Sequence, residues 1–183
     1  KYHKLLKSVD GFDCRVLPSF RPDKALNAHL DGFADYIKKL GIAADVEIKS
    51  YKDVITALLK RADYFNEIGC RISDQAFDYV PFKISADDEI EAVFVRAMNG
   101  EKLTQSDIDG YKTKVLLALG EKYHELGWAM EIHIGAMRNN NTAMFNAKGA
   151  DIGFDSVGDD NIAYPLSRFL DALNVNGKLP KTI

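Results

Sequence analysis

A histidine and an arginine lie five residues apart in the segment GWAMEIHIGAMRNNN, which runs from Gly127 to Asn141. Its apolar residues predict a short strand, Ala129–Gly135, that carries His133 towards its end, and the polar loop beyond presents Arg138. A histidine there can bind a metal or move a proton, because its charge changes near neutral pH. An arginine can bind a carboxylate or an enediolate through its planar, permanently charged fork. A strand histidine is more often a core residue bonded to a backbone carbonyl, but the nearby arginine favours a site for a small anionic substrate.

Two further polar residues follow predicted strands. Arg21 follows the strand predicted at Arg15–Phe20, and Asp74 follows the strand predicted at Gly69–Ser73. Each has an ordinary structural alternative, because Arg21 can simply precede a helix and Asp74 can cap a turn. Each also has a functional one, since an arginine binds anions and a carboxylate can act as a base or accept a substrate hydroxyl. We expect Arg21, Asp74 and His133 to share one edge of a parallel sheet, where the active sites of α/β folds lie.

Helical patterns alternate with these strands. Capping residues and apolar spacing predict helices at Pro22–Leu40 (closed by Gly41), from Ser50 (with a capping box to Asp53) to about Phe65, and at Ala86–Met98, Thr104–Leu126 and Asn161–Leu173. Residues 139–160 predict a long loop with one helical turn at Thr142–Ala147, and Leu179–Ile183 predicts a last strand. Strands that alternate with helices predict an α/β fold with a parallel sheet.

The composition excludes several classes of function. The formal net charge is −3 without a basic patch, which argues against nucleic acid, and no apolar run approaches the ~18 residues of a membrane span. The isolated cysteines Cys14 and Cys70 favour a reduced, cytoplasmic setting. The chain has no HxH, HExxH or CxxC motif, so no self-sufficient metal site is expected.

Five segments in order resemble the uronate isomerase (glucuronate isomerase) family of the amidohydrolase superfamily. They are LPSFRPDKA, GCRISD, GWAMEIHIGAMRNNNTAMF, GADIGFDSVGD and LPKTI, and they extend over nearly the whole chain. The resemblance implies part of a distorted (β/α)8 TIM-type barrel with additional helices, in which residues 1–183 form a central segment without the first and last strands. It also implies a divalent metal, usually zinc, and the interconversion of D-glucuronate with D-fructuronate and of D-galacturonate with D-tagaturonate.

The resemblance also assigns residue roles. His133 is then the active-site histidine and a candidate metal ligand, Asp74 an active-site carboxylate, and Arg21 and Arg138 residues that bind the substrate. Two departures from the family pattern stand out. The main metal ligands, an HxH pair on the first strand and an aspartate on the last, have no counterpart in this chain, and Gln75 stands where the family usually has a histidine.

Two other functions compete with isomerisation. One is a metal-dependent hydrolase of the same superfamily, which needs a metal-bound water directed at a scissile bond, whereas the arginines at the strand ends favour a substrate carboxylate. The other is a non-catalytic piece of a barrel. The partners expected are a hexuronate substrate and, because a partial barrel exposes strand edges, further copies of the chain in a homo-oligomer, with neither nucleic acid nor membrane.

Overall fold

Three parallel strands form the sheet that positions the candidate residues. In a computed structural model of the chain, which describes residues 5, 9, 11 and 14–183, the strands lie in the order β1 (Ile72–Ala76), β2 (Ala129–His133) and β5 (Lys181–Thr182). The helices are α2 (Asp23–Leu26), α3 (Phe33–Ala44), α4 (Tyr51–Glu67), α5 (Asp87–Met98), α6 (Gln105–Glu125), α7 (Thr142–Lys148) and α8 (Ala163–Asn174). The predicted parallel α/β arrangement is therefore confirmed.

The strand predicted at Arg15–Phe20 is wrong except for its last residue. Only Phe20 pairs with β1, through an isolated parallel bridge to Ser73 in which Phe20 N donates to Ile72 O at 3.1 Å. Asp74 N in turn donates to Phe20 O at 2.9 Å. Residues 15–19 have no strand partner, so their apolar composition did not suffice to make a strand. The bridge still brings Arg21, the next residue, to the same edge of the sheet as β1.

The segment predicted as one helix from Pro22 to Leu40 is two helices. Helix α2 ends after one turn, and Gly32 then adopts a left-handed φ of 81° at the N-cap of α3. A helix cannot continue through that conformation, which glycine adopts without a steric cost. The predicted end at Gly41 is also wrong, because α3 continues to Ala44. Gly41 lies where a Cβ would come within 2.8 Å of Val46 O, so the close approach of the chain explains the glycine.

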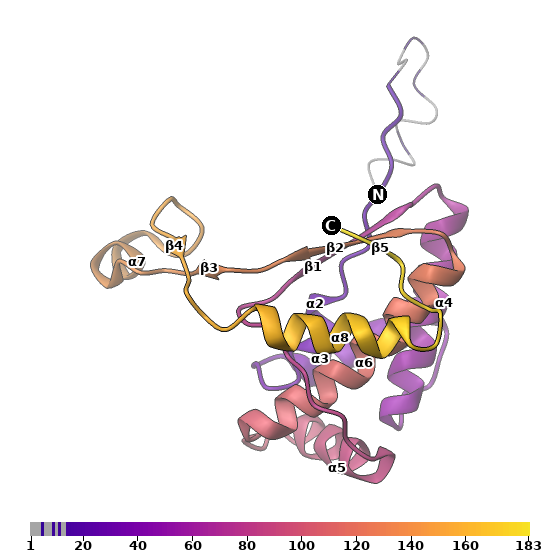
Figure 1. Cartoon of the computed structure of the whole chain (residues 1–183), viewed down its shortest axis with the longest axis horizontal. Coiled ribbons are helices and arrows are strands. Elements are labelled where there is room, and N and C mark those ends of the chain that lie inside the picture. The colour runs from indigo at the N-terminus through magenta and orange to yellow at the C-terminus, as the bar shows by residue number, and fades with distance from the viewer. Residues whose placement is uncertain (1–4, 6–8, 10, 12–13) are drawn as a thin grey trace.

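One side of the sheet faces the helices (Figure 1), and the core consists mainly of side chains that pack between helices α2 to α6 and α8, joined at the sheet by Trp128 and Met130. Trp128, which is 1% exposed, stacks on Tyr123 with ring centroids 5.7 Å apart. Phe20 packs against both rings at 6.0 and 6.2 Å. The indole N–H of Trp128 donates to Asn66 Oδ1 at 3.0 Å, so its buried polar group is satisfied. These contacts fix the edge of the sheet against α4 and α6.

A separate arm extends away from this core, as the left side of Figure 1 shows. It consists of an antiparallel pair, β3 (Ala136–Met137) with β4 (Ser156–Val157), and helix α7 between them. The helical turn predicted at Thr142–Ala147 is confirmed by α7, which has no buried residue. The predicted long loop is therefore a small hairpin that carries Arg138 beyond the end of the sheet.

Both cysteines that fall within the described residues are free, Cys14 exposed and Cys70 buried. Among the described residues, no helix combines the length and the apolar character that crossing a bilayer requires.

The capping box predicted at Ser50 and Asp53 is confirmed at the start of α4. Ser50 Oγ accepts from Asp53 N at 3.2 Å, and Asp53 Oδ2 accepts from Ser50 N at 2.9 Å. Hydrogen bonds from Lys49 N and from Ser50 lower the pKa of Asp53 below its ordinary 3.8. A lowered carboxyl pKa stabilises the fold above the ordinary value, and that stability is lost as the pH falls through the lowered value.

Ser50→Ala is expected to lower the free energy of unfolding by about 1 kcal/mol at pH 7, because the first turn loses its cap. The variant also loses one of the hydrogen bonds that lower the pKa of Asp53. The difference in the free energy of unfolding between variant and wild type should therefore be smaller at acidic pH. Urea denaturation at pH 7 and at pH 3 measures both effects. Ser50→Thr, which keeps the hydroxyl, is the control and should stay close to wild type, and an equal loss in both variants would contradict the capping role.

Candidate functional site

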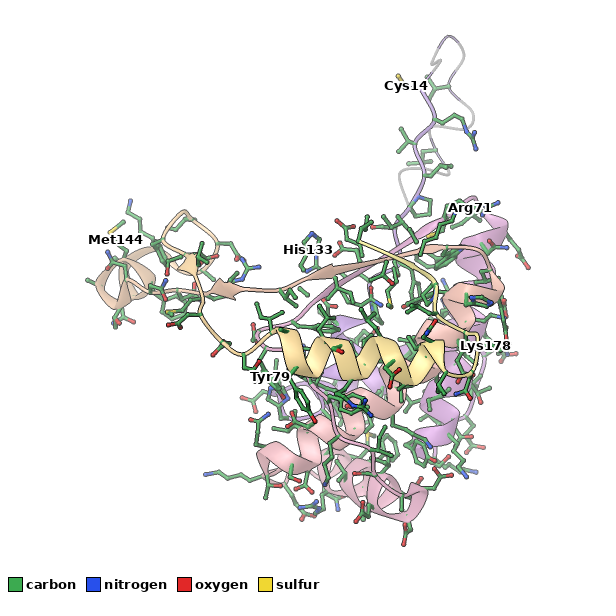
Figure 2. All side chains as sticks on the ribbon, in the orientation of Figure 1. Cys14, Arg71, Tyr79, His133, Met144 and Lys178 are labelled. Carbon is green, nitrogen blue, oxygen red and sulfur yellow. The ribbon has the colours of Figure 1, made fainter. Side chains whose placement is uncertain are left out.

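Three ionisable side chains from neighbouring strands meet on the side of the sheet opposite the helices. Asp74 lies on β1, and Glu131 and His133 lie on β2, with Asp74 paired in register to Glu131. Successive side chains of a strand point to opposite faces, so Glu131 and His133 share a face while Ser73 and Gln75 turn the other way. Figure 2 shows His133 on the side of β2 that faces away from helix α8.

The ring of His133 contacts both carboxylates. Its Nδ1 lies 2.9 Å from Asp74 Oδ1, and its Nε2 lies 3.2 Å from Glu131 Oε1. Only an imidazolium can donate from both nitrogens at once, so a neutral ring can make only one of these two contacts as a hydrogen bond. The side chain of His133 is 52% exposed, against 19% for Asp74, so the ring is open to a ligand while its main partner is sheltered.

Arg21 joins this group from the edge of the sheet. Its Nη1 lies 3.4 Å from Asp74 Oδ2, and its Nε donates to Asp23 Oδ2 at 2.7 Å. The bond to Asp23, followed by the charge of that carboxylate, raises the pKa of Arg21 above its usual value. Asp23 Oδ1 also accepts from Ala76 N at 3.3 Å, at the end of β1. Asp23 therefore holds Nε of the guanidinium against the sheet and Asp74 lies near Nη1, while the Arg21 side chain as a whole is 53% exposed.

The prediction that Arg21, Asp74 and His133 share one edge of the sheet is confirmed by these contacts, with one correction. Asp74 does not follow its strand, because β1 runs from Ile72 to Ala76 and contains it. The strand predicted at Gly69–Ser73 was placed too early because Gly69 adopts a φ of 101°, which belongs to a turn.

Asp74, Glu131 and His133 can together hold a metal ion. Each offers one ligand atom, and these atoms lie within 4.8 Å of one another. Two carboxylates and an imidazole are a donor set that divalent metals such as zinc accept. Glu131 was not singled out from the sequence, although its spacing of two residues from His133 on a strand places both on one face.

Arg138 lies apart from this group, on the arm. Its Nη1 donates to Asp155 Oδ2 at 2.8 Å, and the backbone N–H of Asn139 donates to Asp155 Oδ1 at 2.9 Å. The hydrogen bond from Asn139 N has the larger effect and the one from Arg138 the smaller, and together they lower the pKa of the Asp155 carboxyl. No hydrogen bond or ion pair among the described residues joins Arg138 to Arg21, Asp74 or His133, so the structure unites three of the four predicted site residues.

Gln75, at the position where a histidine was expected, faces the core. It is 1% exposed, and neither its amide oxygen nor its amide nitrogen has a hydrogen-bond partner among the described residues. It lies between Asp74 and Ala76 on the opposite face of β1, which carries it away from Glu131 and His133.

Comparison with known proteins gives consistent likenesses. The family model described as glucuronate isomerase matches residues 1–183. The chain is 50% identical to the uronate isomerase of Caldanaerobacter subterraneus subsp. tengcongensis and 46% identical to that of Clostridium acetobutylicum, over 183 residues in each case. These matches cover all of the chain but only 39% of either relative, so the chain spans well under half the length of the curated proteins it matches.

Solved structures show the same partial coverage. A crystal structure of uronate isomerase from Thermotoga maritima matches with a TM-score of 0.86 and 31% identity, over 98% of this chain and 39% of that one. The glucuronate isomerase of Caulobacter crescentus matches with a TM-score of 0.79 over 94% of this chain and 36% of that one, and at 22% identity it is a likeness of fold.

Proposed function

The chain belongs to the glucuronate isomerase family, and on that premise we propose that it contributes to an aldose–ketose isomerase of hexuronates. The reaction interconverts D-glucuronate with D-fructuronate, and D-galacturonate with D-tagaturonate. The observation that supports it most is the placement of His133 between two carboxylates, beside Arg21 at the same edge of the sheet. A group that moves protons and a group that binds anions are thus side by side. Incubation of the full-length protein with D-glucuronate, with the products followed by NMR, tests the proposal.

The chemistry of the reaction sets what the residues must do. An aldose–ketose isomerisation moves a hydrogen between C2 and C1, so it needs a base, a stabiliser for the enediolate oxygen and an anchor for the uronate carboxylate. In our proposal His133 carries the proton at its ring nitrogen, and Asp74 orients the ring through Nδ1 and accepts a substrate hydroxyl. Arg21 binds the carboxylate with the part of its guanidinium that Asp23 and Asp74 leave free.

We also propose that Asp74, Glu131 and His133 hold a divalent metal, zinc in the first place, because their donor atoms fit one. For His133 this role is an alternative to proton transfer, because a ring nitrogen that binds a metal cannot carry the proton. When bound, such an ion polarises a carbonyl or hydroxyl oxygen of the substrate. The principal ligands that the family resemblance implies, an HxH pair and an aspartate, would come from outside this chain. Because those ligands lie on the first and last strands of the barrel, we propose that residues 1–183 form a central segment of it.

Glu131→Gln in the purified chain is expected to weaken zinc binding at least tenfold. Loss of a residue that only hydrogen-bonds to a metal ligand typically lowers metal affinity about 10- to 100-fold, and loss of a ligand itself should cost no less. Isothermal titration with zinc chloride measures the affinity without any need for activity. Glu47→Gln, which changes an exposed carboxylate that pairs with Lys49, is the matched control. Equal zinc affinity in wild type and Glu131→Gln would rule out a metal at this position.

Arg138 is proposed to bind the substrate carboxylate or the developing enediolate. Its guanidinium is 47% exposed and free to bind in addition to Asp155. In the full-length protein, Arg138→Lys should lower kcat/KM about 10- to 150-fold, nearly as much as Arg138→Ala, because a point charge cannot replace a bidentate fork. A raised KM indicates ground-state binding, and a lowered kcat indicates stabilisation of the transition state.

Arg168→Lys is the control for this experiment, since Arg168 is about as exposed, at 49%, and pairs with Asp171 on α8. It should leave kcat/KM unchanged. Wild-type efficiency in Arg138→Lys would make Arg138 a surface residue of the arm.

We further propose that the protein acts in the cytoplasm as a homo-oligomer and binds neither nucleic acid nor membrane. Among the described residues β5 pairs on one side only, with β2, and its outer edge offers unpaired backbone groups. The arm adds exposed apolar side chains, of which Val157 is 88% exposed. Covering such surface favours association. The balanced charge and the two isolated free cysteines support the remaining parts of this proposal.

A further inference from the structure

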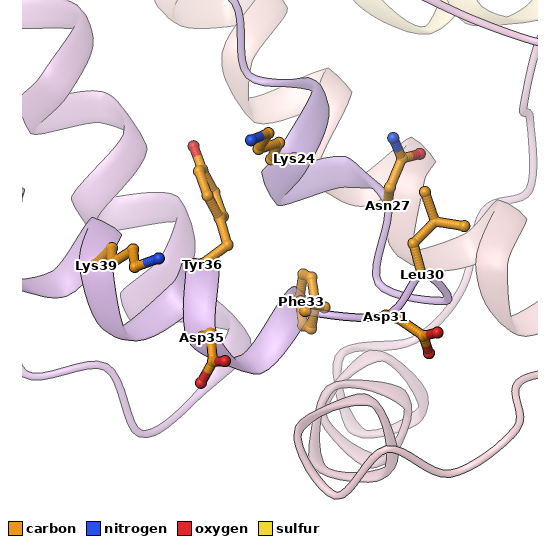
Figure 3. Close-up of a pocket in the computed structure, with 9 residues that line it drawn as sticks. Lys24, Asn27, Leu30, Asp31, Phe33, Asp35, Tyr36 and Lys39 are labelled. Atoms are coloured by element: carbon orange, nitrogen blue, oxygen red, sulfur yellow. The ribbon is translucent and has the colours of Figure 1, made fainter. Parts of the chain in front are cut away.

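A cavity of about 410 Å³ lies between α2, the loop that follows it and the start of α3 (Figure 3). This volume is within the range of sites for small organic ligands. It is lined by Lys24, Asn27, Leu30, Asp31, Gly32, Phe33, Asp35, Tyr36 and Lys39. None of these residues belongs to the group around His133, so the cavity is separate from the candidate active site.

Three hydrogen-bond donors line the cavity. Figure 3 shows the amine of Lys24 and the hydroxyl of Tyr36 at the same end, and the amine of Lys39 on the other side of the Tyr36 side chain, directed towards it. None of these three polar groups has an ion-pair or hydrogen-bond partner among the described residues. Burial, and then the charge of Asp23, raise the pKa of Tyr36, so its hydroxyl keeps its proton and remains a donor. Two ammonium groups and a phenol form a binding surface for a carboxylate.

Acceptors occupy the other side. Figure 3 places Asp31 and Asp35 at the far end from Lys24 and the Tyr36 hydroxyl. Asp31 has no ion-pair partner among the described residues, and Asp35 pairs only loosely with Lys38, at 3.7 Å. Ionised carboxylates accept hydrogen bonds and cannot donate them, so this end suits a ligand that carries hydroxyl groups. Leu30 and Phe33 provide the apolar part of the wall.

The cavity adjoins a second one of about 280 Å³ that reaches Arg21. Tyr36 and Lys39 line both cavities. The cations Lys24, Lys39 and Arg21 thus lie along neighbouring cavities, which increases the attraction for an anion on this side of α2.

From this arrangement we propose that the first cavity is a second binding site for hydroxylated carboxylic acids of the sugar-acid class. The carboxylate of the ligand lies against Lys24, Lys39 and Tyr36, and its hydroxyl groups donate to Asp31 and Asp35. A simple carboxylate or inorganic phosphate can bind only to the donors, and a neutral sugar can bind only to the two aspartates. The site does not depend on the chemistry at His133.

Titration of the isotope-labelled chain with four compounds tests the proposal by NMR. D-Glucuronate carries both features, acetate and inorganic phosphate carry only the anion, and D-glucose carries only the hydroxyl groups. Glucuronate should shift the backbone amide signals of Gly32, Phe33 and Tyr36 at concentrations where the other three do not. Equal affinity for acetate or phosphate would overturn the sugar-acid assignment, and the absence of any shift at these amides would overturn the site.

Variants then locate the binding. Lys24→Gln with Lys39→Gln should weaken glucuronate binding at these amides at least tenfold, because two charge-assisted hydrogen bonds are lost. Lys102→Gln with Lys148→Gln removes the same charge from two exposed positions outside the cavity and should change nothing. Asp31→Asn should weaken glucuronate binding but leave the weak acetate response as it was. Unchanged glucuronate binding in the variant with Lys24→Gln and Lys39→Gln would overturn the proposal.

The His133→Gln chain separates this site from the proposed active site. Glucuronate should still shift the amides of the cavity in that variant, whereas shifts at Glu131 and at residue 133 itself should be lost. Loss of the cavity shifts together with those of the sheet would mean that only one site exists, and would overturn the inference while leaving the proposed function intact.

Discussion

His133→Gln in the full-length protein is expected to lower kcat for hexuronate isomerisation about 100- to 10,000-fold, the usual contribution of a positioned proton-transfer group. Glutamine is close to histidine in size and can still bond to Asp74, but it cannot take up or release a proton. The loss should therefore fall mainly on kcat, with a smaller change in KM. Initial rates of ketose formation from D-glucuronate measure both constants.

His124→Gln is the matched control for this variant. His124 is exposed, and its Nδ1 lies 3.1 Å from Leu179 O, so it is not part of the group around His133. Its replacement should leave kcat within a small factor of wild type. If His133→Gln retains the wild-type kcat and its pH profile, proton transfer through His133 is wrong.

Trp128→Ala is expected to lower the free energy of unfolding by about 3–5 kcal/mol, the usual cost of truncating a large buried aromatic residue. The indole fills the space between the sheet edge and helices α4 and α6, stacks on Tyr123 and bonds to Asn66. The free energy of unfolding from urea denaturation, monitored by far-UV circular dichroism, measures the loss.

Trp128→Phe provides the comparison. It keeps an aromatic ring against Tyr123 but loses the N–H bond to Asn66 and part of the packing, so its loss should be smaller than that of alanine. A loss below about 1 kcal/mol in Trp128→Ala would mean that this aromatic group does not hold the sheet to the helices.

The features that the sequence predicted well are local ones. Ser50 with Asp53 begins α4 as a capping box, which depends only on residues three apart, and α6 begins after Thr104 as predicted. Strand β2 was also recognised, because its apolar residues stand between Gly127 and the polar loop. The α/β class was predicted correctly, and the chain has the fold of part of a TIM-type barrel, as its resemblance to solved uronate isomerases implies.

The features that the sequence did not predict depend on contacts between residues far apart in the chain. The register of β1 is set by its pairing with β2, Ile72 opposite Ala129, and no pattern within residues 69–76 specifies it. The single bridge at Phe20 has the same origin. The β3–β4 pair joins two-residue strands about twenty residues apart in sequence, too short for any alternation of apolar and polar residues to appear.

The candidate site follows the same division. Parallel strands bring their ends together, so Arg21, Asp74 and His133 could be expected at one edge before any coordinates. The roles of Asp23 and Glu131 required the structure, because each is defined by a contact with a residue that other elements position. The separation of Arg138 from this group follows from the hairpin, whose existence the sequence did not indicate.

Conversion of D-glucuronate by the full-length protein decides whether this chain contributes to a hexuronate isomerase. The full-length protein, supplied with zinc, is incubated with D-glucuronate, and the carbon skeleton is followed by NMR. We expect an equilibrium mixture of D-glucuronate and D-fructuronate, with no carbon–carbon bond broken and with ketose formation slowed at least about 100-fold in His133→Gln. Unchanged D-glucuronate after incubation with the folded, zinc-loaded protein would contradict the claim.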